Sequence, residues 1–519
     1  MTTDVRLFRD TYVDSVVQLS ATRAMLDLPD VDWAAAAMAT PANLETLTAE
    51  GFSVEGRDSA NDLFLAVRAA DDEAVNAALG AGENALFASR KSAGPATARP
   101  HRTIRRAVRD QPDTNVAIIS VPGDYATLEA HDALSAGLDV LLFSDNVSVD
   151  DEIALKERAS GLHRLVMGPG AGTAMLGGTG LGFANVVTPG RVGIVAAAGT
   201  GAQEAMSLLD RWGVGISCVI GLGGRDLSEA VNGRMAKAAI ASLRADSRTD
   251  LIFFVSKPPA PHVAREVLAT AGEAPFVASL VGFADDRIAV QHLPDGDRAP
   301  LTGRLARTLE GGALQVLDAL DVARPKLVSD ALQERVARAC RTVAVDRTLI
   351  RGLFSGGTLC YESLVILHDI VGAVYSNAPL DDSLHVPAPP GSHICLDLGE
   401  EEYTVGRPHP MIDPQARVEL LLETASDPMV AVILLDVVLG LGSHADPASQ
   451  LAPACEAAID HGIAVVAYVL GTEGDPQNLK RQRQILEDVG CIVTETAARA
   501  SLAASAIAIR DPGILVTQL

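Results

Sequence analysis

The chain has 519 residues, enough for roughly three or four domains, and 48% hydrophobic content with only 4% aromatic residues predicts aliphatic cores, as in layered α/β proteins. A formal net charge of −24 argues against affinity for nucleic acid or an anionic membrane, so backbone amides and a few cations would have to hold a bound anion. The six cysteines are widely spaced and form no CxxC pair. We therefore expect reduced thiols, no metal and a cytoplasmic location.

Residues 1–86 alternate helical and extended patterns and predict a small amino-terminal α/β domain. The segments "DSVVQLSATRAML" and "PANLETLTAEG" are typical of helices, whereas "VDWAAAAMA" and "DLFLAVRA" are typical of strands. Residues 88–101 are rich in alanine, serine, proline and basic residues, which indicates a linker.

From residue 102 onwards, aliphatic strands alternate with helices, which predicts doubly wound parallel sheets covered on both faces. The first such domain, residues 102–187, contains "NVAIISV", "DVLLFSD" and "RLVMGPG" and is expected to be a CoA-binding, Rossmann-like domain. Two flavodoxin-like domains follow at residues 188–325 and 345–515. The expected fold class is therefore α/β, with several doubly wound parallel-sheet domains after a small amino-terminal one.

Two of these domains begin with similar strand–turn–helix segments, "VGIVAAAGTGAQEA" and "IRGLFSGGTLCYES", each with a glutamate four residues past the threonine. Small residues at such a turn let backbone N–H groups approach an anion at the positive end of the helix dipole. Two helix ends that face one another could hold one phosphate, and the alternative is a pair of tight turns with nothing bound. The predicted phosphate-binding residues are Ala198, Gly199, Thr200, Gly201, Ser355, Gly356, Gly357 and Thr358.

Several charged residues are further candidates for the site. In "RPHP", two prolines restrain Arg407 and His409, which favours contact with a ligand, although a rigid surface turn has the same pattern. Arg225 is either a substrate contact or a member of a structural ion pair beside a helix cap. Asp397 and Asp436 lie within apolar strands, and because buried carboxylates need partners, both could contact substrate, order a site or cap strand ends.

The two turns, together with "MGPG", "GLGG", "LDLG" and "VAVILLDVVLG", resemble the α/β domains of succinyl-CoA synthetase and its acyl-CoA synthetase relatives, in which paired helices grip a phosphohistidine. Over nearly the whole chain, "MATPANLE", "FSDNV", "GLGGRDLS", "FVSKPP", "TVGRPHPMIDP" and "LLDVVLGLGSHADPA" resemble the FdrA family. This second resemblance implies a subunit of an oxamate carbamoyltransferase of purine (allantoin) breakdown, which works with two other subunit types.

Departures from these patterns bear on the chemistry. Where the synthetase carries its histidine in Gly-His-Ala-Gly, this chain reads "FADDRIAVQHLPDG", so we expect no phosphohistidine at His292. Lys257 of "FVSKPP" stands where the synthetase has a glutamate that orients the histidine, and a cation there suits an anion or a polarised carbonyl. Gly170 and Ala171 replace the Asp and Cys of the FdrA pattern, which puts any function of that acid or thiol in doubt.

The resemblance predicts carbamoyl transfer between oxalurate and phosphate, giving oxamate and carbamoyl phosphate, with no cofactor besides these substrates. Lys257 and Arg407 would stabilise the developing oxyanion, and His409 would polarise the carbonyl or move a proton. One alternative is an NDP-forming acyl-CoA synthetase-like ligase with CoA on the domain around residues 115–185, and another is a non-catalytic scaffolding or regulatory subunit. The expected partners are small anions and the other subunits, not nucleic acid or membrane.

Overall fold

The fold comes from a computed structural model, which describes residues 1–9, 11, 13, 15–53, 62–92, 101–283, 304–404 and 408–519. Contacts divide the chain into an amino-terminal unit, residues 1–100 and 401–408, and a main unit, residues 101–400 and 409–519. Among the described residues, no helix combines the length and the apolar character that crossing a membrane requires.

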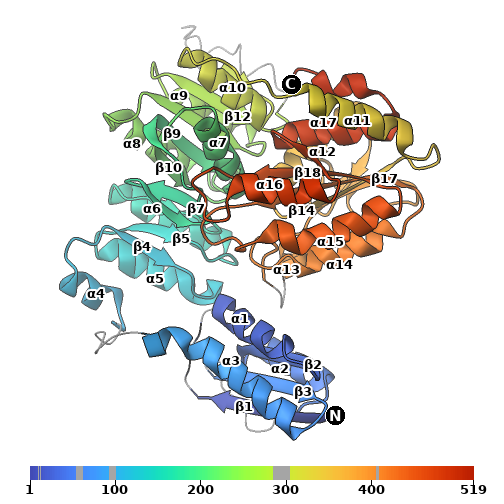
Figure 1. The fold of residues 1–519 in the computed structure, drawn as a ribbon. Coiled ribbons are helices and arrows are strands. Elements are labelled where there is room, and N and C mark those ends of the chain that lie inside the picture. Colours follow the sequence, from blue (N-terminus) through green and yellow to red (C-terminus); the bar gives the residue numbers. More distant parts are fainter. Residues whose placement is uncertain are drawn as a thin grey trace. The chain divides into compact units, whose positions relative to one another are not determined.

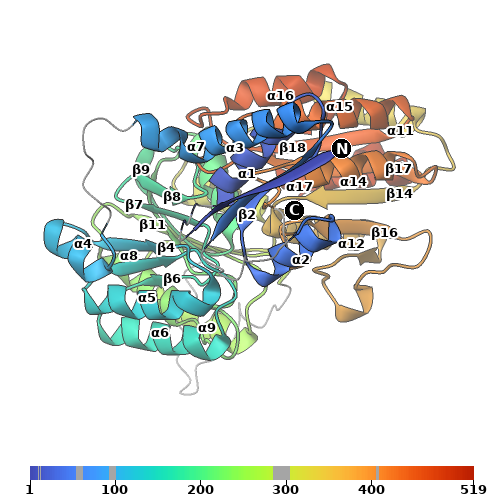
Figure 2. The same ribbon diagram turned by 90° about the horizontal axis from the view of Figure 1, so that it is seen from below.

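The amino-terminal unit contains a three-stranded antiparallel sheet in the order β1-β3-β2. Apolar residues on both faces of the strands are buried, and Figure 2 shows α1 and α3 on one side of the sheet and α2 on the other. The helix α3 continues to Ser92, so the first residues of the expected linker are helical. The elements are β1 (Thr2–Phe8), α1 (Ser15–Leu26), β2 (Val31–Met38), α2 (Pro41–Ala49), β3 (Leu63–Ala69), α3 (Asp72–Ser92) and α13 (Glu401–Thr404).

The main unit begins with a small parallel sheet in the order β4-β5-β6, as expected of half a Rossmann-like domain. Its elements are α4 (Ile104–Asp110), β4 (Val116–Ile119), α5 (Gly123–Ser135), β5 (Asp139–Leu142), α6 (Val149–Gly161) and β6 (Val166–Met167).

A seven-stranded sheet follows, in the order β13-β12-β11-β9-β10-β7-β8. Its five strands from β9 to β13 are parallel and have the flavodoxin order 2-1-3-4-5. The hairpin β7–β8 precedes the expected boundary at 187/188 but hydrogen-bonds to β10 of this sheet. The elements are β7 (Thr173–Leu176), β8 (Thr179–Gly182), β9 (Pro189–Ala197), α7 (Gly199–Arg211), β10 (Ile216–Gly221), α8 (Arg234–Ala245), β11 (Leu251–Ser256), α9 (Pro261–Thr270), β12 (Phe276–Leu280), β13 (Arg304–Ala306) and α10 (Leu309–Ala319).

A six-stranded parallel sheet completes the main unit, in the order β15-β16-β14-β17-β18-β19. In Figure 1, α12 and α17 lie on one side of its strands, and α14 and α15 lie on the other. The elements are α11 (Asp330–Thr342), β14 (Leu349–Phe354), α12 (Gly357–Val371), β15 (Val374–Tyr375), η1 (Asp382–Leu384), β16 (His393–Asp397), α14 (Gln415–Ala425), β17 (Val430–Val438), α15 (Pro447–Asp460), β18 (Ala464–Leu470), α16 (Leu479–Asp488), β19 (Ile492–Thr494), α17 (Ala497–Ile509) and η2 (Pro512–Val516).

One hydrophobic core joins the two large sheets and sets the position of α7 and α12. Side chains alternate along β9, so that Ile194 enters this core and Val195 enters a second core on the opposite face. Ala202 of α7 and Leu359 of α12 belong to the shared core, and the two helices contact one another. The several parallel sheets confirm the predicted α/β class, and the shared core brings together the helices that carry the two predicted turns.

Candidate functional site

The two predicted turns meet. We call residues 198–201 the α7 turn and residues 355–358 the α12 turn. The Thr358 backbone N–H donates to Thr200 Oγ1 over 3.2 Å. A Cβ added to Gly201 would lie 3.0 Å from Thr358 Cγ2, and one added to Gly356 would lie 3.0 Å from Thr200 Cγ2. Gly201 thus lies against Thr358, and Gly356 lies against Thr200. Packing between the two turns is enough to explain why these two positions are glycines.

The α7 turn has an open helix end. Ala198 precedes the first residue of α7, and its side chain makes no capping hydrogen bond. Gly199 is exposed, and the nearest atom to an added Cβ there is Thr173 Oγ1 at 3.9 Å, so packing does not require a glycine at this position. The first N–H groups of a helix have no partner within it, so residues 199–201 present backbone donors at the positive end of α7.

The α12 turn is instead held by the protein's own carboxylates. Asp436 Oδ1 accepts from the Ser355 N–H and hydroxyl over 2.8 and 2.9 Å, and Asp436 Oδ2 accepts from the Gly356 N–H over 2.8 Å. Arg417 Nη2 lies 3.2 Å from Asp436 Oδ1, and both side chains are buried. Asp436, a predicted substrate contact, thus anchors the turn, and the Ser355 and Gly356 amides that were expected to bind phosphate are already engaged.

Asp397 and His409 converge beside this turn. A Cβ on Gly399 would lie 2.7 Å from His409 Nε2 and 3.2 Å from Asp397 Oδ1, and a Cβ on Gly357 would collide with Asp397 Oδ2. Burial raises the pKa of Asp397 to about 7, although the positive charge of Lys257 opposes this rise. Burial lowers the pKa of His409 to about 4, so the ring is neutral at pH 7. His409 Nδ1 accepts from the Met411 N–H over 3.2 Å, which leaves the proton on Nε2.

Lys257 follows β11 and reaches the same region from the other large sheet. Its side chain is half-buried, and its Nζ lies 5.7 Å from the centre of the Tyr361 ring on α12. This contact places the ammonium group beside α12, and its positive charge lowers the pKa of Asp397. Arg407 and His292 lie outside the described residues, so their predicted roles stay predictions.

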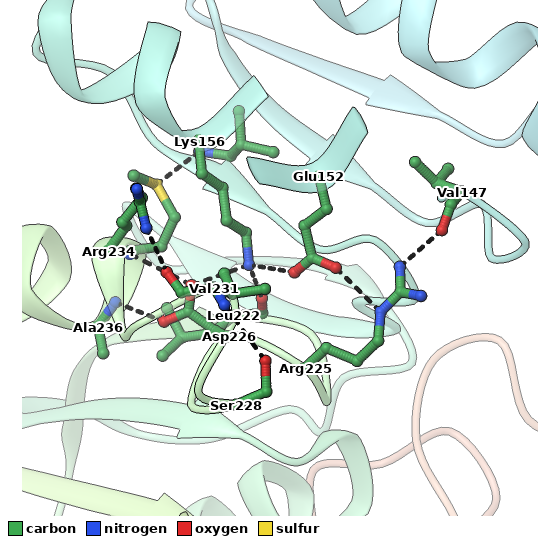
Figure 3. Close-up of polar contacts among 12 residues, drawn as sticks. Val147, Glu152, Lys156, Leu222, Arg225, Asp226, Ser228, Val231, Arg234 and Ala236 are labelled. Atoms are coloured by element: carbon green, nitrogen blue, oxygen red, sulfur yellow. Dashed lines mark hydrogen bonds and ion pairs between the residues drawn. The ribbon is translucent and has the colours of Figure 1, made fainter. Parts of the chain in front are cut away.

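Arg225 lies in the loop after β10, at the exposed side of an ion cluster whose other members are buried, shown in Figure 3. Arg225 Nε lies 2.9 Å from Glu152 Oε2, and the fully buried Lys156 Nζ donates to Glu152 Oε1 over 2.7 Å and to Asp226 Oδ1 over 2.8 Å. Asp226 Oδ2 also accepts from the Ala236 N–H over 2.9 Å and so caps α8. The helix cap that the sequence allowed is present, whereas Arg225 pairs with Glu152 and not with Asp226. The Arg225 side chain is 44% exposed, so the ion pair gives it a structural role, and its contact with substrate stays a prediction.

Sequence reasoning missed the environment of the glutamates that follow the two threonines. Glu204 Oε2 accepts from the Tyr468 hydroxyl over 2.6 Å, and Glu362 Oε1 accepts from the Leu309 N–H over 2.6 Å. Both side chains are buried, and desolvation raises the pKa of Glu204 to about 7 and that of Glu362 to about 8. The repeated four-residue spacing was visible in the sequence. Whether Glu204 or Glu362 lies near a cation depends on contacts between the two large sheets, which the sequence does not show.

A hollow of about 530 Å³ lies at the start of α5 and α6 in the Rossmann-like part. It is lined by Gly123, Asp124, Thr127, Leu128, His131, Asn146, Val147, Ser148 and Asp151. Two carboxylates and no lysine or arginine line it, and burial and the nearby Arg158 lower the pKa of His131. The two carboxylates oppose a bound anion here, whereas the amino-terminal ends of α5 and α6 favour one.

Two family models match the chain. A model described as CoA-ligase matches residues 353–507, which include the α12 turn, Asp397 and His409. A model described as "AllF, heavy metal-associated domain" matches residues 1–101. Residues 1–101 contain no cysteine and a single histidine, His101, so they do not supply the set of cysteine and histidine ligands that is typical of a zinc site.

The chain is 38% identical over 511 residues to the Escherichia coli (strain K12) protein named "Uncharacterized protein YahF", covering 95% of this chain and 96% of the relative. It is 32% identical over 126 residues to an Archaeoglobus fulgidus succinate–CoA ligase subunit alpha, covering 24% of this chain and 44% of that subunit. A solved acetyl-coenzyme A synthetase 1 of Ca. Korarchaeum cryptofilum has 17% identity and a TM-score of 0.30, covering 82% of this chain and 90% of that one.

Proposed function

From the premise that this chain belongs to the succinyl-CoA synthetase-like, AllF-type family that includes YahF, we propose that it is a subunit of a carbamoyltransferase. The proposed reaction moves a carbamoyl group between oxalurate and phosphate, giving oxamate and carbamoyl phosphate. The identity of the substrates rests on the resemblance to the FdrA family, and the chain's residues support the anionic and carbonyl chemistry.

The observation that carries the proposal is the open end of α7 beside the α12 turn. Backbone N–H groups of residues 199–201 would bind phosphate, because a partly buried helix end contributes up to about 2 kcal/mol and each hydrogen bond to a charged group roughly 1.5–3 kcal/mol. These contributions suffice for a phosphate site in an acidic protein without a cluster of basic side chains.

Two side chains would act on the carbonyl group. Lys257 stabilises the oxyanion that develops when phosphate attacks the carbamoyl carbon. His409 is held neutral by burial, so it polarises the carbonyl through its Nε2–H and does not carry the proton. Arg407 is a further candidate for the same charge. No covalent enzyme intermediate is required, because positioning and charge stabilisation are enough for direct transfer.

An NDP-forming CoA ligase is the second candidate, because the CoA-ligase model and the succinate–CoA ligase subunits support it equally well. A scaffolding or regulatory subunit is the non-catalytic alternative.

The test is an assay of the full chain, alone and together with the products of its neighbouring genes. Carbamoyl phosphate formed from oxalurate and phosphate only in the combined sample supports the transferase. Acid-labile phosphate on the chain after incubation with ATP, or ATP-dependent formation of an acyl-CoA, supports the ligase instead. If the combined sample shows none of these activities, the chain is a scaffold or a regulator and the proposal is overturned.

A further inference from the structure

Two buried carboxylates lie on the strands that flank β14: Asp397 ends β16, and Asp436 lies within β17. Their surroundings differ sharply. Asp436 receives three hydrogen bonds from the α12 turn and lies beside Arg417, so its negative charge is fully compensated. Asp397 is only 2% exposed, yet within the described part of the chain only the Gly399 N–H, at 3.0 Å, donates to its carboxylate. Two acids in such different settings are the usual basis of an acid–base assignment.

The position of Asp397 is fixed through its backbone. Asn377 Oδ1 accepts from the Asp397 N–H over 2.9 Å, and Asn377 Nδ2 donates to the Asp397 carbonyl over 2.8 Å. The side chain is thereby held against Gly357 and Gly399, where a methyl group would clash with it or with His409 Nε2. The carboxyl group is thereby placed beside the α12 turn and His409, and among the described residues it has a single hydrogen-bond donor.

The charged groups around Asp397 come from several elements. Lys257 beyond β11 stabilises its carboxylate form, while Glu400 in its own loop and Asp436 on β17 destabilise it. Cys360 and Tyr361 lie on α12, and Arg417 lies on α14 next to Asp436. Burial is the largest influence, and it leaves the pKa at about 7, so both forms are populated at neutral pH.

We propose that Asp397 is the catalytic acid–base group that protonates the leaving nitrogen when oxalurate is cleaved by phosphate, and that it removes this proton in the reverse direction. This role rests on the carbamoyl transfer proposed above. A phosphate oxygen forms a bond to the carbamoyl carbon, the bond from this carbon to the oxamate nitrogen breaks, and the Asp397 carboxyl gives its proton to that nitrogen. Hydrogen phosphate loses its own proton, which restores the carboxyl, so the reaction consumes no net proton.

The test compares Asp397→Asn and Glu400→Gln with the wild type in the assembled complex. Asp397→Asn keeps an oxygen that can accept from the Gly399 N–H but cannot titrate. We expect its rate of oxalurate cleavage to fall about 10²- to 10⁴-fold, and the decline in wild-type rate above about pH 7 to disappear from its pH profile. Glu400→Gln should keep the maximal rate and shift that decline to lower pH, because Glu400 raises the pKa of Asp397.

Phosphate binding separates this role from a structural one. Asp397→Asn should bind phosphate at least as tightly as the wild type at pH 8, because a negative charge beside the site is lost. A variant with wild-type turnover and an unchanged pH profile, or one that loses phosphate binding together with activity, overturns the role of Asp397 alone. A wild-type complex without carbamoyl transfer in either direction overturns the proposed function and this role with it.

Discussion

From the buried carboxyl group of Glu362 we predict how the free energy of unfolding depends on pH. Its Oε1 accepts from the Leu309 N–H, but its Oε2 is buried without a hydrogen-bond partner among the described residues. Burial, reinforced by the negative charge of Glu204, raises its pKa from 4.5 to about 8. The substitution Glu362→Gln keeps an acceptor for Leu309 and removes the titration.

The direction in which the free energy of unfolding changes with pH follows from proton linkage. Between pH 4.5 and about pH 8, the folded chain keeps a proton on Glu362 that the unfolded chain has released. The free energy of unfolding therefore falls as pH rises through this window, by about 1.4 kcal/mol per pH unit for one such group. The stability of Glu362→Gln relative to the wild type should increase by about 3 kcal/mol from pH 5 to pH 7.5.

Denaturant unfolding followed by tryptophan fluorescence measures this difference. The chain has two tryptophans, Trp33 in the amino-terminal unit and Trp212 in the main unit. In a Trp33→Phe background, the signal comes from Trp212, which packs against the same core as α12. Buried acids that do not interact with Glu362, such as Asp397, titrate equally in both proteins and cancel in the comparison.

Glu310 provides the matched control, because Arg499 pairs with its carboxylate, with Nε 3.0 Å from Oε2. Removing one partner of a buried pair costs about 3–5 kcal/mol, so Glu310→Gln should be less stable than the wild type. Parallel pH dependences for Glu362→Gln and the wild type would refute the reasoning about the buried carboxyl.

Two further predictions concern the site and the amino-terminal unit. Lys257→Ala should lower turnover roughly 10²- to 10³-fold while changing phosphate affinity only slightly, as measured by steady-state rates and isothermal titration, and an equal loss in both would contradict a role at the carbonyl. Equimolar Zn²⁺ should leave the Trp33 fluorescence of a Trp212→Phe full chain unchanged, because residues 1–101 contain no cysteine and only one histidine, His101, and a saturable change at one equivalent would show that a metal site is present there.

Much of the fold could be predicted, because the periodicity of apolar residues that marks helices and strands is a local property of the sequence. Near-continuous aliphatic segments such as "VAVILLDVV" become central strands of parallel sheets, and the strand–turn–helix echo marks the first parallel strand of each large sheet. The assignment of the 173–182 hairpin to the seven-stranded sheet could not be predicted in this way, because strand partners are set by contacts far apart in sequence.

The candidate site could be predicted only in part. The small residues correctly marked both helix starts, but the sequence made the two turns look equivalent. Their difference comes from Asp436 and Asp397, which reach the α12 turn from β17 and β16, while the α7 turn receives no side-chain cap. The pairing of Arg225 with Glu152 of α6 was hidden for the same reason.

Titration of phosphate into the assembled complex tests most directly whether the α7 turn is the phosphate site. Gly199 is the position to change, because an added Cβ meets no atom closer than 3.9 Å, whereas a side chain on Gly357 would strike Asp397. Gly199→Ala should bind phosphate nearly as well as the wild type, and Gly199→Val should bind it at least about tenfold more weakly with an unchanged circular dichroism spectrum, because its branched side chain blocks the N–H groups. A well-folded Gly199→Val protein with wild-type phosphate affinity would contradict the account and leave the α7 turn without a ligand.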